Sequence, residues 1–256
     1  MVKGLYTAYT GMVQQQKRMD VVSNNLANSD TNGFKKEGAT SVSFADVYAA
    51  KIKDDSEFYI NRRIGSMSMG AKIGETYTNF DEGPIEVTDN KYDFALDGNG
   101  FFSVSYTNKQ GVTSTKYTRD GSFTLTRDGY LVTDDGDFVL GNNGPIRLDV
   151  NLDTKVDTLG NIYQNDQVVD RFALADFTDY NYLSHYGENF YDLVQGGTFR
   201  PAQCSVVQGV LEASNINVVE EMVSMIDIQR NYESNQKVIQ AIDETLDKAA
   251  NQIGRV

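Results

Sequence analysis

Apolar residues recur every seven positions near the beginning of the chain. This spacing predicts a helix with one apolar stripe, because seven residues make about two helical turns. Gly11 inside this segment costs about 1 kcal/mol relative to alanine, which a close contact with another helix can offset. The turn-forming residues 28–33 predict the end of the helix. The stripe consists of Leu5, Met12, Met19 and Leu26 in one column and Ala8, Gln15 and Val22 in a second, where Gln15 is a polar interruption.

A longer pattern of the same kind lies near the end of the chain. Neither glycine nor proline occurs from Val210 to Ile253, so no helix breaker interrupts this stretch. Asn217 is a suitable N-cap with Glu220 as its capping-box partner, and Gly254 is a suitable residue to end the helix. We expect one helix over 218–253, about 54 Å long. Its first column is Val218, Met225, Tyr232, Ile239, Leu246 and Ile253, and its second is Ile228, Ile242 and Ala249, with Glu221 and Asn235 as polar interruptions.

Between these helices the chain carries the signals of short β-strands. Asp-Gly pairs, which favour tight hairpin turns, begin at positions 97, 120, 128 and 135, and runs of alternating apolar and polar residues lie between them. The predicted fold class is therefore α+β. We expect the N- and C-terminal α-helices to form a coiled-coil-like terminal domain, with a central all-β domain that folds without them. The predicted boundaries are 1–34 plus 205–256 for the helical domain, 35–90 for an extended connecting segment and 91–204 for the β domain.

Charge narrows the range of partners. The net charge of −13 and the pI near 4.5 argue against nucleic acid and anionic surfaces. Residues 1–38 have a net charge of +2 and residues 212–256 a net charge of −4, so the two helical ends attract each other. No run of about 20 apolar residues occurs, so we expect no membrane insertion. We also expect no cleaved signal peptide, because polar residues interrupt the first apolar residues.

The sequence offers little for chemistry at a single site. With one cysteine, Cys204, and one histidine, His185, the chain has neither an internal disulfide nor the ligand pairs of most zinc sites. We expect Cys204 to pack as a small apolar residue and His185 to lie in a loop. The aromatic residues of the β region are expected to form its core.

Two motifs fail as ligand sites. The Gly-Asn-Gly motif at 98–100 lacks the third glycine of a dinucleotide fingerprint, and a strand is predicted to follow it. The acidic loop that begins at Asp93 has Ala95 and Val104 where a calcium loop needs oxygen ligands. We therefore expect no catalytic residue, no cofactor and no metal ligand.

Several stretches of the chain together form a recognisable set of motifs. They are 5–12, 20–28 and 31–35 near the amino terminus, 98–102 and 117–123 in the β region, and 211–222 with 229–233 near the carboxyl terminus. In this order they resemble the motifs of one known family, the bacterial flagellar rod and hook proteins. In length, the chain is similar to the distal rod members of that family, because hook proteins carry extra β domains and proximal rod proteins lack a substantial one.

The resemblance implies a non-enzymatic structural subunit of the basal-body rod, located outside the cytoplasmic membrane. It implies export by the flagellar type III apparatus, polymerisation with copies of itself into a helical tube that transmits torque from motor to hook, and contacts with other rod and hook subunits. We expect the apolar columns to form the assembly interface, which consists of Leu5, Met12, Met19, Val22, Leu26, Val218, Met225, Ile228, Tyr232, Ile239, Ile242, Leu246 and Ile253.

Two other classes of function are compatible with the residues alone. One is a carbohydrate-active enzyme, which needs two facing carboxylates, one with a raised pKa. The other is a binding module whose helices dimerise as a closed coiled coil. A closed dimer stops growing, whereas a heterologous contact continues into a polymer, so the size distribution separates these hypotheses.

Overall fold

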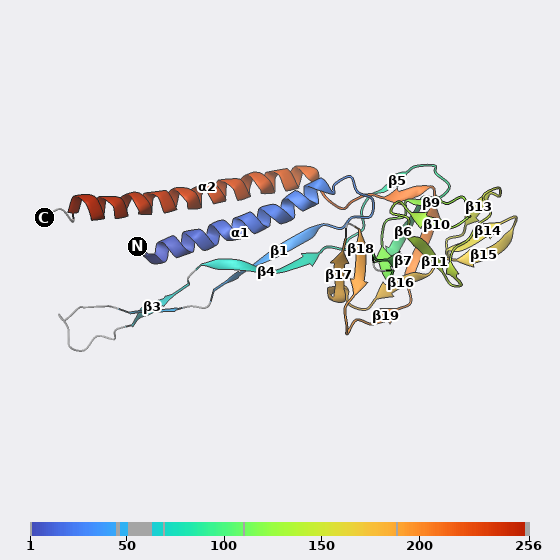
Figure 1. The fold of residues 1–256 in the computed structure, drawn as a ribbon, viewed down its shortest axis with the longest axis horizontal. Coiled ribbons are helices and arrows are strands. Elements are labelled where there is room, and N and C mark those ends of the chain that lie inside the picture. Colours follow the sequence, from blue (N-terminus) through green and yellow to red (C-terminus); the bar gives the residue numbers. More distant parts are fainter. Residues whose placement is uncertain are drawn as a thin grey trace. The chain divides into compact units, whose positions relative to one another are not determined.

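The structure is a computed structural model that describes residues 2–44, 47–50, 63–68, 70–109, 111–187 and 189–253 (Figure 1). The chain forms two compact units, and each is described by itself. The helical unit comprises Met1–Ala27, Glu37–Asn79 and Asn217–Val256, and the β unit comprises Asn28–Lys36 and Phe80–Ile216.

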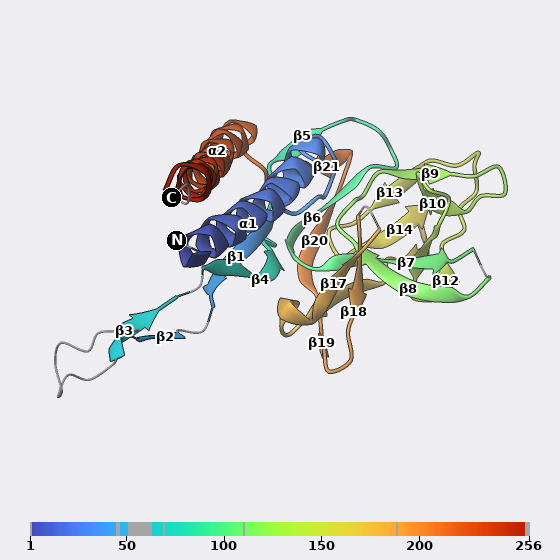
Figure 2. The same ribbon diagram turned by 60° about the vertical axis from the view of Figure 1, so that its left-hand side comes forward.

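The helical unit contains two long antiparallel helices, α1 (Val2–Ala27) and α2 (Val218–Lys248), which lie side by side in both ribbon views (Figures 1 and 2). They approach each other closely at Gly11, where an added β-carbon would lie 2.9 Å from the side-chain nitrogen of Asn235. This contact explains why a glycine is present inside α1 despite its low helix propensity.

Helix α2 begins as predicted and ends earlier. The side chain of Asn217 accepts hydrogen bonds from the backbone N–H groups of Val219 (3.1 Å) and Glu220 (3.4 Å), which satisfies two donors that the first helical turn leaves free. The α-helix ends at Lys248 and continues as a π-helical segment, Ala249–Ile253. The prediction of a regular helix to residue 253 is therefore wrong for its last five residues, and Gly254 lies outside the described residues.

Two antiparallel strand pairs follow α1 in the helical unit. β1 (Glu37–Ser43) pairs with β4 (Ala71–Thr78), with a bulge between Ala39 and Ser41. β2 (Val47–Ala50) pairs with β3 (Arg63–Met67). The first pair packs against α1, where the Gln14 side chain donates a 2.6 Å hydrogen bond to the Ser41 hydroxyl. Much of 35–90 therefore forms longer paired strands than we expected. The sequence did not reveal these strands, because the Gly, Ser and Thr residues of this segment show no apolar alternation.

The β unit is built on a ten-stranded antiparallel sheet whose main path runs β17-β18-β8-β7-β11-β10-β9. Strands β12, β16 and β19 extend it from the side, while β13-β14-β15, β20-β6 and β21-β5 form smaller sheets. The strands are β5 (Ile85–Val87), β6 (Phe94–Asn99), β7 (Phe101–Thr107), β8 (Thr113–Thr118), β9 (Phe123–Leu125), β10 (Leu131–Thr133), β11 (Phe138–Gly141), β12 (Gly144–Pro145), β13 (Thr154–Val156), β14 (Asn161–Gln164), β15 (Gln167–Arg171), β16 (Leu174–Phe177), β17 (Leu183–Tyr186), β18 (Phe190–Leu193), β19 (Phe199–Arg200), β20 (Gln203–Gln208) and β21 (Val210–Glu212), with a short 3₁₀ helix at Tyr180–Tyr182.

Aromatic side chains fill the β unit, as predicted. Phe94, Phe102, Phe123 and Phe172 are buried in one cluster, and the rings of Phe102 and Phe123 meet edge to face at 5.2 Å. A second cluster surrounds Phe101, which is also buried. Edge-to-face contacts between aromatic rings are favourable in addition to the burial of apolar area. Packing of the core therefore explains why these aromatic residues are present.

The β unit includes segments that the predicted boundaries assigned to the helical domain. β20 pairs with β6 along six positions, from Gln203 opposite Asn99 to Gln208 opposite Phe94. The backbone N–H of Gly33 donates a 2.7 Å hydrogen bond to the carbonyl of Glu212. The compact units therefore differ from the predicted 1–34, 91–204 and 205–256, because long-range backbone pairing leaves no local pattern in the sequence.

Candidate assembly surface

The predicted apolar columns lie among the less exposed positions of α1 and α2, and Ile242 and Asn235 of the α2 columns lie against Gly4 and Gly11 of α1. On α1, Ala8 is buried, and Leu5, Met12, Gln15, Met19, Val22 and Leu26 are half-buried. On α2, Ile228 is buried, and Val218, Met225, Tyr232, Asn235, Ile239 and Ile242 are half-buried. The structure thus brings these columns together within one chain. Leu246 differs because its side chain is 42% exposed, and the side chain of Ile253 lies outside the described residues.

A buried polar pair lies among these apolar residues. Asn25 of α1 and Glu221 of α2 are 1% and 3% exposed, and the Asn25 side-chain nitrogen donates to the Glu221 carboxylate at 3.4 Å. The same Asn25 side chain donates to the Glu37 carbonyl (2.9 Å) and accepts from the Glu37 N–H (3.0 Å). Asn25 therefore ties both helices to β1. The seven-residue pattern marks Glu221 only as an interruption and gives no signal for Asn25, although a polar pair within a helix–helix seam is a known way to specify register.

Each helix also has a second apolar face, which the structure leaves exposed. On α2, Val219, Met222, Val223 and Ile226 form the α2 patch, with exposed fractions from 47% (Ile226) to 69% (Val219). Their spacing of three and four residues places them on one side of the helix.

The corresponding residues of α1 form the α1 patch, which consists of Tyr6, Tyr9 and Val13. Tyr6 and Tyr9 are 53% and 56% exposed. Contiguous exposed apolar residues of this kind mark interaction surfaces. Neither patch falls on the seven-residue columns, so the sequence pattern did not predict them.

A closed cluster of charges is buried inside the β unit. The ammonium of Lys35 lies 2.5 Å from the Glu212 carboxylate, and the guanidinium of Arg119 lies 3.1 Å from it. Lys35 also donates to the Asp81 carbonyl (2.7 Å), and the Gly83 N–H donates to Glu212 (3.0 Å). Burial lowers the pKa of Lys35 from its ordinary value, while the negative charge of Glu212 opposes that change. The cluster fastens the segment 28–36 to the β unit.

The two residues with candidate chemistry are packed among apolar groups. The prediction that His185 lies in a loop is wrong, because His185 lies in β17 opposite Tyr191 of β18. Its ring makes edge-to-face contacts with Phe34 (6.3 Å) and Tyr191 (5.6 Å). Cys204 packs against the first aromatic cluster, and burial raises the pKa of its thiol. A raised pKa is the opposite of what an activated nucleophile needs. The described residues contain no group of metal-ligating side chains, and none of their helices is long and apolar enough to span a membrane.

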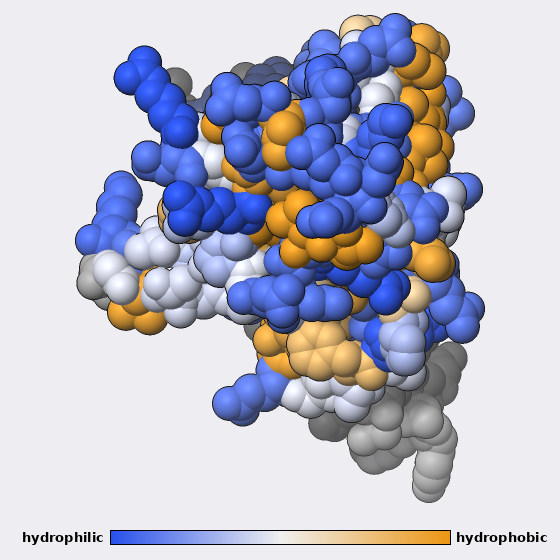
Figure 3. Space-filling model, turned by 90° about the vertical axis from the view of Figure 1, so that its right-hand side faces the viewer, coloured by the Kyte–Doolittle hydropathy of each residue, from blue (hydrophilic) through white to orange (hydrophobic). Residues whose placement is uncertain are grey.

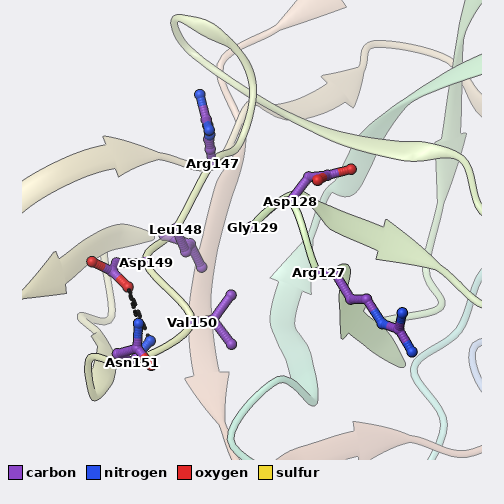
Figure 4. Close-up of a pocket in the computed structure, with 8 residues that line it drawn as sticks. All are labelled: Arg127, Asp128, Gly129, Arg147, Leu148, Asp149, Val150 and Asn151. Carbon is purple, nitrogen blue, oxygen red and sulfur yellow. Dashed lines mark hydrogen bonds between the residues drawn. The ribbon is translucent and has the colours of Figure 1, made fainter.

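The surface of the β unit has a hollow of about 570 Å³ beside the turn at Gly129 (Figure 4). The side chains of Asp128 and Asp149 point away from each other, so they do not form the facing pair that a glycosidase needs. Asp149 instead accepts hydrogen bonds from the backbone and side chain of Asn151, at 3.0 and 3.3 Å. Arg147 lies over the ring of Tyr130, 5.5 Å from its centre. Asp149 and Arg147 are therefore engaged locally.

On the side of the β unit that carries β13–β15, apolar residues lie in separate patches between hydrophilic ones (Figure 3). Exposed apolar residues of this region include Leu159 and Val168. Scattered exposure of this kind is normal for a folded protein. The ordered spacing of the α1 and α2 patches makes them the stronger candidates for assembly.

Models of three protein families match separate parts of the chain. The family described as "Flagella basal body rod protein" matches residues 5–35. The "Flagellar hook protein FlgE/F/G D1 domain" matches residues 95–164, and "Flagellar basal body rod FlgEFG protein C-terminal" matches residues 207–253. The matched segments lie in both compact units.

Individual relatives are similar over nearly the whole chain. The flagellar hook-basal body complex protein FlhO of Bacillus subtilis (strain 168) is 30% identical, covering 100% of both chains. The flagellar basal-body rod protein FlgF of Caulobacter vibrioides is 32% identical, again covering 100% of both. The flagellar basal-body rod protein FlgG of Buchnera aphidicola subsp. Baizongia pistaciae is 32% identical over 97% of this chain and 98% of its own.

Proposed function

This chain belongs to the family of flagellar basal-body rod and hook proteins and is a structural subunit of the rod; we propose that it polymerises into the helical axial tube that transmits torque from the motor to the hook. The observation that carries the proposal is the pair of long terminal helices, each of which keeps a second apolar face exposed. A subunit that exposes two different apolar faces can bind a different neighbour through each, which gives an open, heterologous assembly. Both the distal rod protein and its close rod paralogue fit this role.

The helical unit is the proposed assembly domain, with α1 and α2 paired as in a coiled coil. The alternation of three and four residues between the less exposed positions of α2 supports this pairing. In this proposal the predicted interface columns hold the two helices together, and Leu246, which is exposed on α2, is available to a neighbouring subunit.

Other rod and hook subunits are the proposed neighbours at the two ends of the tube, as the names of the relatives suggest. We propose that the flagellar type III apparatus exports the chain in an unfolded state. The single cysteine supports this, because no internal disulfide opposes unfolding or passage through a narrow channel.

A non-enzymatic role fits the family, whose members in the comparisons are named as rod proteins. The competing enzymatic hypothesis predicts two facing carboxylates, and at the hollow near Gly129 the two aspartates point apart. The competing hypothesis of a closed dimer predicts that all apolar helix faces are buried between the two copies of the dimer.

Electron microscopy and sedimentation of the purified chain over increasing concentration test the proposed function. We expect monomers below a threshold concentration and tubes above it, because growth by a heterologous contact does not stop at a fixed size. A species that remains a dimer at every concentration would contradict polymerisation. Glycan hydrolysis that a single Asp or Glu substitution abolishes would favour the enzymatic hypothesis.

A further inference from the structure

Three segments of the β unit meet at Glu212. The Glu212 carboxylate accepts hydrogen bonds from the ammonium of Lys35 (2.5 Å) and from the N–H of Gly83 (3.0 Å). Its backbone carbonyl accepts a hydrogen bond from the N–H of Gly33 (2.7 Å). Glu212 therefore joins two distant segments of the chain to its own. We call these three segments the clamp, and they are 28–36, 80–84 and 212–216.

Asn215 links the same three segments a second time. Its side chain accepts a hydrogen bond from the N–H of Lys36 (2.8 Å) and donates one to the Asp81 carbonyl (3.0 Å). Phe34, which precedes this contact, is only 1% exposed, so the first segment is embedded in the β unit. The chain passes between the compact units in or directly beside the clamp, at 27–28, 36–37, 79–80 and 216–217.

The relative direction of the segments determines how the clamp carries a pulling force. Gly33 lies opposite Glu212 and Lys36 lies opposite Asn215, so the first and last segments run parallel. The chain therefore enters the first segment and leaves the last one at opposite ends of their contact. A force that pulls these two ends apart makes the segments slide along each other, and all the cross-links bear it at once. Cross-links that are loaded together withstand a larger force than cross-links that open one after another.

We propose that the clamp is a mechanical lock, which carries tension through the β unit and shields Glu37–Asn79 from it. This stretch leaves the β unit after the first segment of the clamp and returns to it at the second. No tension reaches the stretch while both segments stay fixed to the third. The inference rests on the proposed function, because a rod subunit that transmits torque is under load. Its contacts lie within a single copy, so they can be measured without polymerisation.

Single-molecule pulling of the monomeric full chain, held by tags at its two ends, tests the lock. Because α1 and α2 are antiparallel, the force first separates them from one end and then reaches the clamp. We expect the β unit to open in one high-force step that releases residues 28–216, about 620–680 Å of extended chain. A weak clamp would instead open first and release residues 28–79, about 170–190 Å, in a separate earlier step. Observation of that earlier step would overturn the inference.

Matched amide variants separate a mechanical role from a general loss of stability. Asn215→Ala removes two cross-links of the clamp. The control is Gln164→Ala, because Gln164 bridges backbone groups in the same way outside the clamp. It accepts from the Asp149 N–H and donates to the Asp149 carbonyl, both at 3.0 Å.

Forced unfolding follows the rate of crossing the unfolding barrier and not the equilibrium stability. We therefore expect the opening force to fall by at least about a third for Asn215→Ala and by less than about a tenth for Gln164→Ala. Urea unfolding of both variants shows how far each substitution lowers the stability of the β unit. Asn215→Asp keeps the acceptor for Lys36 and loses the donor to Asp81, so its opening force should be intermediate. This variant also takes the place of Asn215→Ala if that one does not fold.

The lock and the proposed function can fail separately. Equal opening forces for the Asn215 variants and the Gln164→Ala control would overturn the lock, while the proposed function stands if the unmodified chain forms tubes. If the chain forms no tubes and the Asn215 variants open at lower force, the proposed function fails and the lock is confirmed as a property of the single copy.

Discussion

At the scale of single residues, the β unit contains a buried cluster of three charged side chains. Lys35, Arg119 and Glu212 are each at most 2% exposed, and their charges are satisfied by one another and by backbone groups. Breaking a buried ion pair by removing one partner costs more than the pair contributes, because the remaining charge stays desolvated.

The first prediction concerns this cluster. Glu212→Gln leaves Lys35 and Arg119 without a counter-charge, so we expect the free energy of unfolding of the β unit to fall by about 3–5 kcal/mol. Urea unfolding followed by β circular dichroism measures this change. The control is Asp153→Asn, which breaks the exposed pair with Lys91 and should leave the unfolding midpoint unchanged. Equal midpoints for both variants would show that the buried cluster is not structurally important.

The second prediction concerns Cys204. Burial raises the pKa of its thiol, so at pH 8 it should react with iodoacetamide more slowly than the same thiol in urea-unfolded protein. The folded state binds this proton more tightly than the unfolded state. The contribution of Cys204 to stability is therefore complete below the unfolded pKa and falls as the pH rises above it. Mass spectrometry of timed samples measures the alkylation rate, and faster alkylation of the folded chain would contradict the pKa direction.

At the scale of elements, the pairing of α1 with α2 depends on a mixed seam. Apolar columns supply the burial, while Gly11 permits close approach and the Asn25–Glu221 pair favours one register. A seam of this kind is sensitive to an added charge, because a carboxylate there is partly removed from water without a partner.

The third prediction tests the seam with Ile239→Asp. Ile239 is half-buried, so we expect the helical unit to lose about 1–3 kcal/mol while the β unit stays folded. Purified variant should remain soluble but form no tubes at the normal threshold, and cells that carry it should not swim. Glu244→Gln, at an exposed position of the same helix, should cost less than about 0.5 kcal/mol. Normal swimming of Ile239→Asp cells would exclude the seam from assembly.

At the scale of the whole molecule, chain order and compact units do not coincide. The β unit takes in 28–36 from before the strand pairs β1–β4 and β2–β3, and it extends to residue 216. The sequence alone led us to expect that 91–200 folds without the termini. The structure changes this expectation, because that fragment lacks β20, the pairing partner of β6, as well as Glu212.

The fourth prediction follows from this division. A fragment of residues 91–200 should unfold without a cooperative transition, whereas a fragment of residues 80–216 should melt cooperatively. A peptide of residues 28–36 should raise the melting temperature of the longer fragment, because Lys35 then pairs with Glu212. Thermal melts followed by circular dichroism measure all three. A cooperative melt of the short fragment would show that the hairpins alone complete the core.

The sequence by itself determined the features that depend on local spacing. The seven-residue columns predicted both helices, and Asn217 predicted the start of α2, because each of these signals lies within one element. The Asp-Gly pairs at 128 and 135 lie in the β9–β10 and β10–β11 hairpin turns, as predicted. The other two predictions are wrong: Asp97-Gly98 lies inside β6, and Asp120-Gly121 connects β8 to β9, which do not pair with each other. The resemblance to rod and hook proteins came from motifs along the chain, and the relatives confirm the family.

Only the tertiary structure decided which chemical groups meet. Lys35 lies 177 positions from Glu212 and Asn25 lies 196 positions from Glu221, and no local pattern encodes such a pair. The same is true of the exposed patches. An apolar residue on α2 belongs to the seam or to the outer face according to where α1 covers the helix, and that coverage arises only when the two ends of the chain come together.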